Sequence, residues 1–470
     1  EVSQGIEIER LLTFLHGPRL GLEDERETVF KSIRQLLPGE YLTIDTMSFE
    51  IKVERYWSLE KKEAFEGLQI DEAANQFKSL LSDSIKIRMR SDVPVGSCLS
   101  GGLDSSSIVC LNRETLGPLE NYNVFTGRFP DTKSDEWKYA REIIKATHVK
   151  SHVVTPSPVG FLAELPDFMW HNELPVGSAS QYAQWCVFRL AKEEGVTVLL
   201  DGQGADELLG GYEQYFQAYL STCRAAGRYD VNEEMAIRSR YPAAHLTIKQ
   251  DILSRLPGGV RYHLANLFNK GSDFRFGLTP DARDKLKNFD GKLCSESLTL
   301  NECLREDSFH AHLPTLLRYG DRNSMAHSRE VRLPFCDHRI AELSFSLAPH
   351  ILMGDAQTKR LLRESMKGIL PEAVRTRWNK QGFLPPQEEW FNTDLIDWVE
   401  EIVTSASFLE RGFWNVSWWR AAVRRMRAGE RHLAWQLWRP AICESWYRFV
   451  VDRAATMPRH SVFAASGQII

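Results

Sequence analysis

Between residues 71 and 200 short apolar segments alternate with segments of helix length, and this alternation constrains the fold more than any other feature. Phe77, Leu81 and Ile85 recur at four-residue steps, which predicts a helix that ends near Arg90. Further helices are predicted at 105–112, 136–147 and 182–194, and strands at 93–99, 122–129, 151–155 and 196–200. Strands that alternate with helices indicate an α/β fold, in which helices cover both faces of a parallel sheet.

The segments on either side of this region have different patterns. Residues 40–45 and 48–53 alternate apolar and polar side chains, which predicts the strands of a short β-rich N-terminal piece. Beyond Tyr212 the chain is predicted to be mostly helical as far as Arg453, and residues 461–470 are expected to form a loosely held tail. We therefore expect three parts, at residues 1–60, 61–455 and 456–470.

Composition excludes several classes of function. A formal net charge of -5 offers no positive field for nucleic acid. No apolar run reaches the roughly 18 to 20 residues of a membrane span, and the chain does not begin with a signal peptide. The eight cysteines are scattered without a metal-ligand spacing, which favours reduced thiols in a cytoplasmic enzyme. Residue 1 is Glu rather than Met, so we expect a processed or truncated chain.

The stretch LSGGLDSSS, residues 99–107, follows the first predicted strand of the sheet and begins a helix. Its two glycines allow backbone N–H groups to approach a ligand, and a helix N-terminus attracts anions. Three serine hydroxyls add donors, so the turn predicts a phosphate cradle, and Asp104 implies a bridging Mg²⁺. A tight strand–helix turn in which these side chains only cap the helix explains the local residues equally well.

The strand predicted at 196–200 also ends in a glycine-rich turn that carries acids, DGQGADE at residues 201–207. Adjacent acids such as Asp206 and Glu207 are usually solvated or favoured by a helix N-terminus. In a parallel sheet, however, strand ends meet at the edge where ligands bind. We therefore expect carboxylates from the two turns to share one Mg²⁺ and to neutralise a leaving pyrophosphate.

Four blocks in order carry a family resemblance: DVPVGSCLSGGLDSS (92–106), LLDGQGADELLGGY (199–212), LLRYGDRNSMAHSREVRLPFCDHR (316–339) and TKRLLRESMKGILPEAVRTRWNKQGF (358–383). The first resembles the pyrophosphate-binding loop of ATP pyrophosphatases. Together the blocks resemble the synthetase domain of glutamine-hydrolysing asparagine synthetases, over about residues 27–450. The resemblance implies an adenine nucleotide α-hydrolase-like fold, with ATP and Mg²⁺ as cofactors.

The resemblance also assigns binding roles to residues of the two turns. By this resemblance ATP phosphates are held by Ser100, Gly101, Gly102, Asp104, Ser105 and Ser106. The adenosine and the rest of the nucleotide are bordered by Leu99, Thr126, Asp201 and Gly202. Mg²⁺ is carried by Asp104 and Asp206.

Three further positions are implied to be catalytic. Lys380 matches a lysine near the α-phosphate, where a cation stabilises the charge of departing pyrophosphate; the alternative is an ordinary surface lysine. Glu330 matches an acid near the acceptor pocket, although an ion pair with Arg329 or Arg332 explains it equally. Gln203 stands where some members carry Glu and β-lactam-forming relatives carry Tyr. An amide cannot take a proton from an attacking amine as a carboxylate does, so the proton acceptor stays open.

Residues 27–41 and 55–57 resemble the closing strands of the glutaminase domain of this family. Residues 1–60 are therefore interpreted as the C-terminal remnant of a glutaminase (Ntn-type) domain. No cysteine occurs before Cys98, so the catalytic N-terminal cysteine of that domain is absent. The chain as given is not expected to hydrolyse glutamine, and its ammonia would be free or supplied by the parent protein.

The leading hypothesis is a ligase that activates a carboxylate with ATP as an acyl-adenylate, by default converting aspartate and ammonia into asparagine, AMP and pyrophosphate. An alternative keeps this chemistry in a cyclase or amidotransferase that acts on a peptide, a β-amino acid or a sugar acid. A third hypothesis is a nucleotide-binding protein without catalysis. Small-molecule substrates, no nucleic acid or membrane partner, and a homodimer are the remaining expectations.

Overall fold

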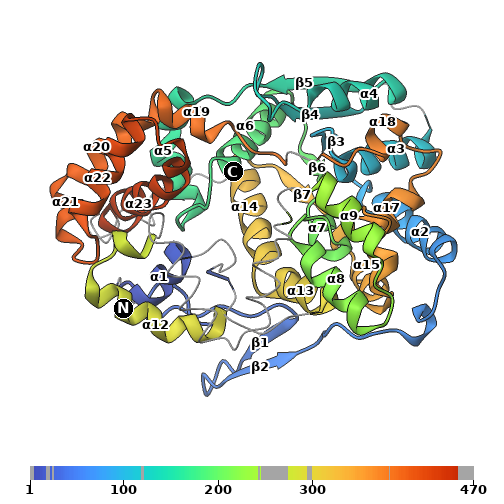
Figure 1. The fold of residues 1–470 in the computed structure, drawn as a ribbon, viewed down its shortest axis with the longest axis horizontal. Helices are drawn as coiled ribbons and strands as arrows, with labels where there is room; N and C mark the ends of the chain where they lie inside the picture. Colours follow the sequence, from blue (N-terminus) through green and yellow to red (C-terminus); the bar gives the residue numbers. More distant parts are fainter. Residues whose placement is uncertain are drawn as a thin grey trace.

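A computed structural model describes residues 5–16, 22–23, 26–117, 121–241, 244, 274–293, 299–379 and 382–453. The chain is built around a five-stranded parallel sheet with the order β5-β4-β3-β6-β7 (Figure 1). Its strands are β3 Val95–Cys98, β4 Asn123–Gly127, β5 Lys150–Val154, β6 Val198–Leu200 and β7 Glu330–Arg332. The predicted α/β class is confirmed, and β7 is an edge strand that the sequence pattern did not predict.

The strand order reverses at the middle of this sheet. From β3 the chain proceeds outward through β4 to β5, then returns to place β6 on the other side of β3. Connections that leave β3 and β6 in opposite directions open a crevice beyond their carboxyl ends, where ligands of such sheets bind. The two glycine-rich turns of the sequence, after residues 98 and 200, both follow strands at this point.

Helices cover both faces of the sheet. On one face α2, α3 and α4 enclose a core that includes Phe77, Val109 and Val124. On the other face α6 packs against β4 and β5 around Phe125 and Phe188, and α14 lies beside α6 and β7. The helices around the sheet are α2 Ile70–Arg88, α3 Leu103–Leu116, α4 Trp137–Thr147, α6 Ser180–Glu193, α7 Ala205–Leu209, α8 Tyr215–Ala225, α9 Val231–Arg240, α13 Leu300–Phe309, α14 His312–Ala326, α15 His338–Ser346, α16 Pro349–Leu352, α17 Arg360–Ser365 and α18 Glu372–Arg375.

A second, helical lobe lies beside the sheet (Figure 1). It has its own apolar core, which is rich in tryptophan. Its helices are α1 Ile8–His16, α5 Pro158–Asn172, α12 Pro280–Leu293, α19 Gln387–Asn392, α20 Leu395–Thr404, α21 Ala406–Glu410, α22 Val416–Arg427 and α23 Ala434–Trp446. The predicted helical C-terminal part is thus confirmed. Helix α1 was not predicted, and its Leu11, Leu12 and Leu15 are buried in this C-terminal core.

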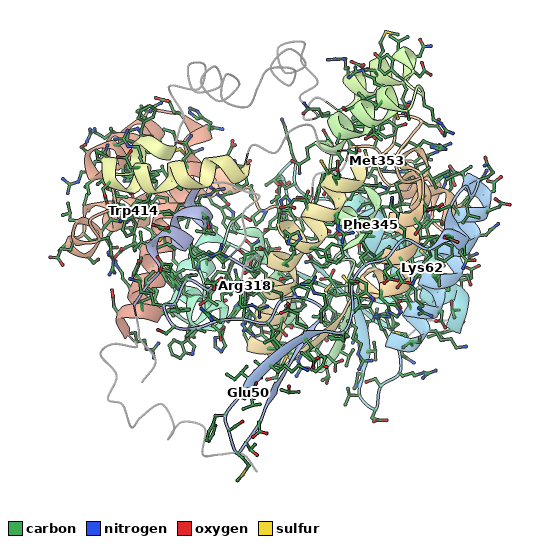
Figure 2. All side chains as sticks on the ribbon, turned by 90° about the horizontal axis from the view of Figure 1, so that it is seen from below. Glu50, Lys62, Arg318, Phe345, Met353 and Trp414 are labelled. Atoms are coloured by element: carbon green, nitrogen blue, oxygen red, sulfur yellow. The ribbon has the colours of Figure 1, made fainter. Side chains whose placement is uncertain are left out.

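The predicted β-rich N-terminal piece is a single antiparallel hairpin, β1 Glu40–Ile44 with β2 Ile51–Arg55. It projects from the body with Glu50 near its tip (Figure 2). The cross-strand pairs Leu42–Val53 and Ile44–Ile51 lie on one face of the hairpin. These four side chains are exposed, so one apolar face of the hairpin is uncovered.

Three other expectations can be compared with the described residues only in part. No helix among the described residues is both long and apolar enough to cross a membrane. The cysteines of the described residues, Cys294 being outside them, are free thiols. The expected tail at 456–470 lies outside the described residues.

Candidate functional site

The turn after β3 is shaped by glycine and by serine hydroxyls. Gly101 has φ +82°, which favours glycine, and a Cβ there would lie 2.6 Å from the Ala140 backbone nitrogen. Gly102 precedes the first turn of α3, and its N–H donates to the Ser100 hydroxyl at 3.2 Å. The Ser105 hydroxyl accepts from the Ser100 N–H, also at 3.2 Å. These bonds fix the turn so that the N-terminus of α3 faces the crevice.

The turn after β6 lies directly against the first. A Cβ on Gly202 would be 2.9 Å from the Asp104 Cβ, so only glycine permits this approach. The Gly202 N–H donates to the Asp201 carboxylate at 2.6 Å. Gly204, at φ +92°, then starts α7, which carries Asp206 and Glu207 in its first turn. The acids of both turns therefore meet at one edge of the sheet, as predicted.

Lys359 connects the two turns electrostatically. Its Nζ donates to both carboxylate oxygens of Asp104 at 2.6 and 2.7 Å and lies 2.7 Å from Oδ1 of Asp206. The lysine side chain is only 3% exposed, and a lysine is rarely buried without such partners. A Cβ on Gly211 would overlap the Asp206 carboxylate and the Lys359 side chain, so that glycine leaves room for the contact.

Two further acids at the site have raised pKa values. Burial, reinforced by the nearby Asp104 charge, raises the pKa of Asp201 to about 6. Burial and the adjacent Asp206 charge raise the pKa of Glu207 to about 7, although the Tyr212 hydroxyl donates to this carboxylate at 2.5 Å. Burial of the two carboxyl groups therefore favours their neutral forms more than in exposed acids.

A cavity of about 450 Å³ opens over both turns. Its walls come from the turns themselves, from Gln181 and Gln184 of α6, from Leu316 and Tyr319 of α14, and from residues 382–384. A smaller cavity of about 120 Å³ adjoins it and is largely apolar. The smaller cavity is lined by Cys98, Leu99, Ser100, Ser105, Phe125, Gly127, Gln184, Val187, Asp201, Gln203 and Phe383. A polar chamber next to an apolar slot suits a ligand with a charged part and a flat apolar part.

Most of the residues predicted for the site lie together here. Ser100, Gly102, Asp104, Ser105, Asp201, Gly202, Gln203 and Asp206 line the larger cavity, and Leu99 lines the smaller one. Gly101 supports the turn from behind. Thr126 is buried and its hydroxyl donates to the Leu99 carbonyl at 2.6 Å, whereas Ser106 is buried within α3. Neither Thr126 nor Ser106 lines a cavity. Lys380 lies outside the described residues.

The structure places Glu330 outside both described cavities. Glu330 begins β7 and is paired in register with Val198, the first residue of β6. It therefore lies at the amino end of the parallel strands, opposite the edge that carries Asp201 and Asp206. Its carboxylate accepts from Arg332 at 2.6 Å and its side chain is 55% exposed. The alternative interpretation, a local ion pair, describes this residue.

The sequence analysis missed several wall residues and did not single out Lys359. Lys359 lies within the fourth block, two residues before the apolar pair Leu361-Leu362, and this apolar neighbourhood is a local indication of burial. Gln184 lies outside the four blocks, and although Tyr319 and Phe383 lie within them, no local pattern shows that these three distant residues meet at one cavity.

The acids of the two turns fit a magnesium ion. Carboxylate oxygens are the ligands that Mg²⁺ prefers, and proteins commonly supply one or two of them while substrate phosphates supply others. Asp104 and Asp206 are close enough to share one lysine nitrogen. Among the described residues no group of three or more His, Cys, Asp or Glu side chains is arranged as a complete metal site. The site therefore fits a metal that arrives with a phosphate ligand.

Comparison with known proteins matches this architecture to one family. Residues 76–448 match the asparagine synthase family. The chain belongs to the asparagine synthase family. Asparagine synthetase [glutamine-hydrolyzing] 1 of Bacillus subtilis is 27% identical over 404 residues, which cover 81% of this chain and 60% of that protein. Amidase chyE of Penicillium rubens is 25% identical over 439 residues, covering 84% and 65%.

Among solved structures, the NH3-dependent NAD synthetase of Campylobacter jejuni is similar over 48% of this chain and 95% of that chain, with 13% identity and a TM-score of 0.22. This asparagine synthase family chain spans 60% to 65% of the length of the two curated relatives named above.

Proposed function

We propose that this chain catalyses ATP-dependent formation of an amide bond through an acyl-adenylate. The observation that carries the proposal is the pair of glycine-rich turns at the point where strand order reverses, with Lys359 between Asp104 and Asp206. Membership of the asparagine synthase family supports the same chemistry. In the first step a substrate carboxylate oxygen attacks the α-phosphorus of ATP and pyrophosphate leaves. In the second step a nitrogen nucleophile attacks the acyl carbon, AMP leaves and the nitrogen loses a proton.

The proposal gives each part of the cavity a task. The smaller apolar cavity would take the adenine ring, and the turn at 100–105 would bind phosphates through backbone N–H groups and hydroxyls. Asp104 and Asp206 would hold Mg²⁺, which when bound neutralises phosphate charge and favours pyrophosphate departure. Lys359 holds the two carboxylates in position. Lys380 is proposed, from the family resemblance, to stabilise charge at the α-phosphate.

Gln203 lies where the two cavities adjoin, since it lines both of them. This position supports a role at the reacting centre, between nucleotide and acceptor. Its amide can orient a nucleophile by hydrogen bonds but cannot accept the proton that the nitrogen loses. We therefore propose a positioning role for Gln203 and assign proton removal to another group or to solvent.

Aspartate with ammonia is the default substrate pair by family resemblance. One observation, however, favours an acid with a single carboxylate. Among the described residues that line the larger cavity there is no Lys, Arg or His, whereas six are Asp or Glu. The second carboxylate of aspartate would thus meet no described cation in this wall. An acid with one carboxylate, such as a β-amino acid or a peptide carboxyl group, suits the wall better, and a relative named as an amidase belongs to the same set of matches.

Residues 1–60 are proposed to be the closing part of a glutaminase-type domain. The uncovered apolar face at Leu42, Ile44, Ile51 and Val53 supports this proposal, because an isolated hairpin is only marginally stable in water. Strands of this kind are stabilised when they belong to a larger sheet.

The experiment that tests the activity measures pyrophosphate release from ATP and Mg²⁺ with ammonium as nitrogen source. Aspartate and β-alanine form a matched pair of acids, because they differ only in the second carboxylate. Release that depends on aspartate, with asparagine formed, establishes the default pair. Faster pyrophosphate release with β-alanine than with aspartate establishes an acid with a single carboxylate as the substrate. ATP binding without release in the presence of any acid tested would refute the proposed activity and favour a non-catalytic nucleotide-binding protein.

A further inference from the structure

The first turn of α4 supports two parts of the site at once. Gly101 of the phosphate turn lies so close to it that a Cβ would be 3.0 Å from the Glu136 carbonyl oxygen and 3.2 Å from the Tyr139 Cβ. From the same turn, the Glu136 carboxylate forms an ion pair with Arg377. The Arg377 guanidinium carbon also lies 4.0 Å from the centre of the Tyr139 ring. The phosphate turn and the segment at Arg377 therefore share one anchor.

Arg377 also fixes the chain that follows it. Its Nη2 donates to the Asn379 carbonyl oxygen at 3.0 Å, two residues further along. The chain then reaches the cavity wall at Gly382 and Phe383. On that side Phe383 packs so tightly on Gly127 that a Cβ there would be 2.7 Å from the Phe383 ring. The described parts of this wall segment are thus held at both ends.

The ion pair between Arg377 and Glu136 has features that are unusual for a pair whose only role is to stabilise the fold. The side chains of Arg377 and Glu136 are only 6% and 8% exposed. Nη1 of Arg377 is buried and has no hydrogen-bond partner among the described residues. An unsatisfied buried donor lowers stability, and such groups in native structures call for an explanation.

The positive charge of Arg377 gives this residue a second role at the site, next to Glu136. Glu136 lines the larger cavity together with Ser100 and Gly102 of the phosphate turn. An ionised carboxylate at this place repels phosphate groups. Arg377 neutralises Glu136 and so removes that repulsion.

We propose that Arg377 is a positioning residue for the nucleotide chemistry: it ties residues 377–379, which precede the cavity wall, to the anchor of the phosphate turn and neutralises Glu136 beside that turn. The inference rests on the proposed function. It makes two separable claims, one about tethering and one about charge. Tethering should affect kcat, because Gly382 and Phe383 line the same cavity as the phosphate turn. Charge should affect the affinity for ATP.

The test uses Arg377→Gln, Arg377→Lys and the double variant Glu136→Gln/Arg377→Gln. Affinity for ATP with Mg²⁺ is measured by calorimetry, and kcat by pyrophosphate release with the acid that supports it. Arg375→Gln is the matched control, since Arg375 pairs with the exposed Glu372 and does not line the cavity. Thermal unfolding of every variant is recorded, and the double variant leaves no buried charge unpaired if Arg377→Gln folds poorly.

We expect Arg377→Gln to bind ATP about tenfold more weakly, equivalent to about 1.4 kcal/mol, and to lose at least about tenfold in kcat. The double variant should recover ATP affinity to within about threefold while kcat stays low, because the tether is still missing. Arg377→Lys should keep ATP affinity and lose part of kcat, since an ammonium lacks the fork that reaches Glu136 and Asn379 together.

Two results would overturn the inference: an Arg377→Gln variant whose affinity and kcat both match those of Arg375→Gln, or a double variant that recovers kcat as well as affinity. Absence of pyrophosphate release from the unmodified chain would instead refute the proposed function. The ATP-affinity pattern would still decide the charge claim in that case.

Discussion

Removing the Lys359 ammonium should be the most costly single change at this site in the absence of nucleotide. Its nitrogen lies within 2.7 Å of oxygens from both Asp104 and Asp206, and those side chains are only 12% and 15% exposed. At an effective dielectric constant of about 20, each attraction across roughly 4 Å amounts to about 4 kcal/mol before solvation is counted. Hydration of the released carboxylates offsets part of this loss. Measured losses for one partner of a buried pair are about 3–5 kcal/mol.

We therefore expect Lys359→Met, which keeps most of the side-chain volume, to lower the free energy of unfolding by about 3–5 kcal/mol. Urea titration at pH 7 without nucleotide or metal measures it. Lys78→Met is the matched control, because Lys78 and its partner Glu114 are 36% and 47% exposed, and exposed pairs contribute at most about 1 kcal/mol. Added Mg²⁺ should stabilise Lys359→Met more than the unmodified chain, since two unpaired carboxylates then favour a cation.

The triple variant Asp104→Asn/Asp206→Asn/Lys359→Met separates charge from packing. If the loss comes from unpaired charge, the triple variant should be more stable than Lys359→Met alone. A loss below about 1 kcal/mol in Lys359→Met, or an equal loss in the triple variant, would refute the electrostatic reasoning.

Three more predictions follow from the geometry and charges of the site. Gly211→Ala should cost at least about 2 kcal/mol of stability, because its Cβ would overlap the Asp206 carboxylate and Lys359. Gly320→Ala in α14, where a Cβ meets no atom closer than 4.0 Å, should be neutral or stabilising in the same denaturant titration. Val187→Phe should fill the smaller cavity and weaken ATP binding at least about tenfold by calorimetry, whereas Val159→Phe on the exposed side of α5 should not. Because the pKa of Glu207 is raised from 4.5 to about 7, the folded chain holds this proton where the unfolded chain has lost it. The free energy of unfolding should therefore fall as pH rises from 4.5 through 7, and Glu207→Gln should remove roughly 3 kcal/mol of that fall; a pH dependence unchanged in the variant would contradict the assignment.

The sheet could be predicted wherever local pattern and tertiary environment agree. The strands at 95–98, 123–127, 150–154 and 198–200 are compact and largely apolar, and each lies within a range predicted from the sequence or within a residue of it. Strand β7 could not be predicted, because Glu330-Val-Arg332 is too short and too charged to show a period. Helix α5 carries Pro166 in its interior, which argues against a helix by propensity although the fold tolerates it. Helix α1 has the apolar spacing of a helix, but only the C-terminal lobe explains its burial.

The candidate site also has a part that the sequence predicts and a part that it does not. Its proposed phosphate end is made of contiguous residues whose types are dictated by backbone geometry, as at Gly101 and Gly202, so the sequence alone indicates that they form one turn each. The sequence could not place Glu330 at the amino end of β7, because a motif gives position along the chain but not which end of a strand a residue occupies.

The acceptor end is harder to derive for a physical reason that bears on substrate choice. Gln184, Leu316 and Phe383 reach one cavity from α6, α14 and the segment after α18, and each also fits the ordinary pattern of a packed helix or loop. Nothing in the two glycine-rich turns constrains these walls, so the proposed ATP chemistry is compatible with different acids. Four predicted residues line both chambers, namely Ser100, Ser105, Asp201 and Gln203. A change of substrate in such a site therefore requires changes in the wall residues. The substrate has to be determined by assaying different acids, because the proposed ATP-binding motif does not specify it.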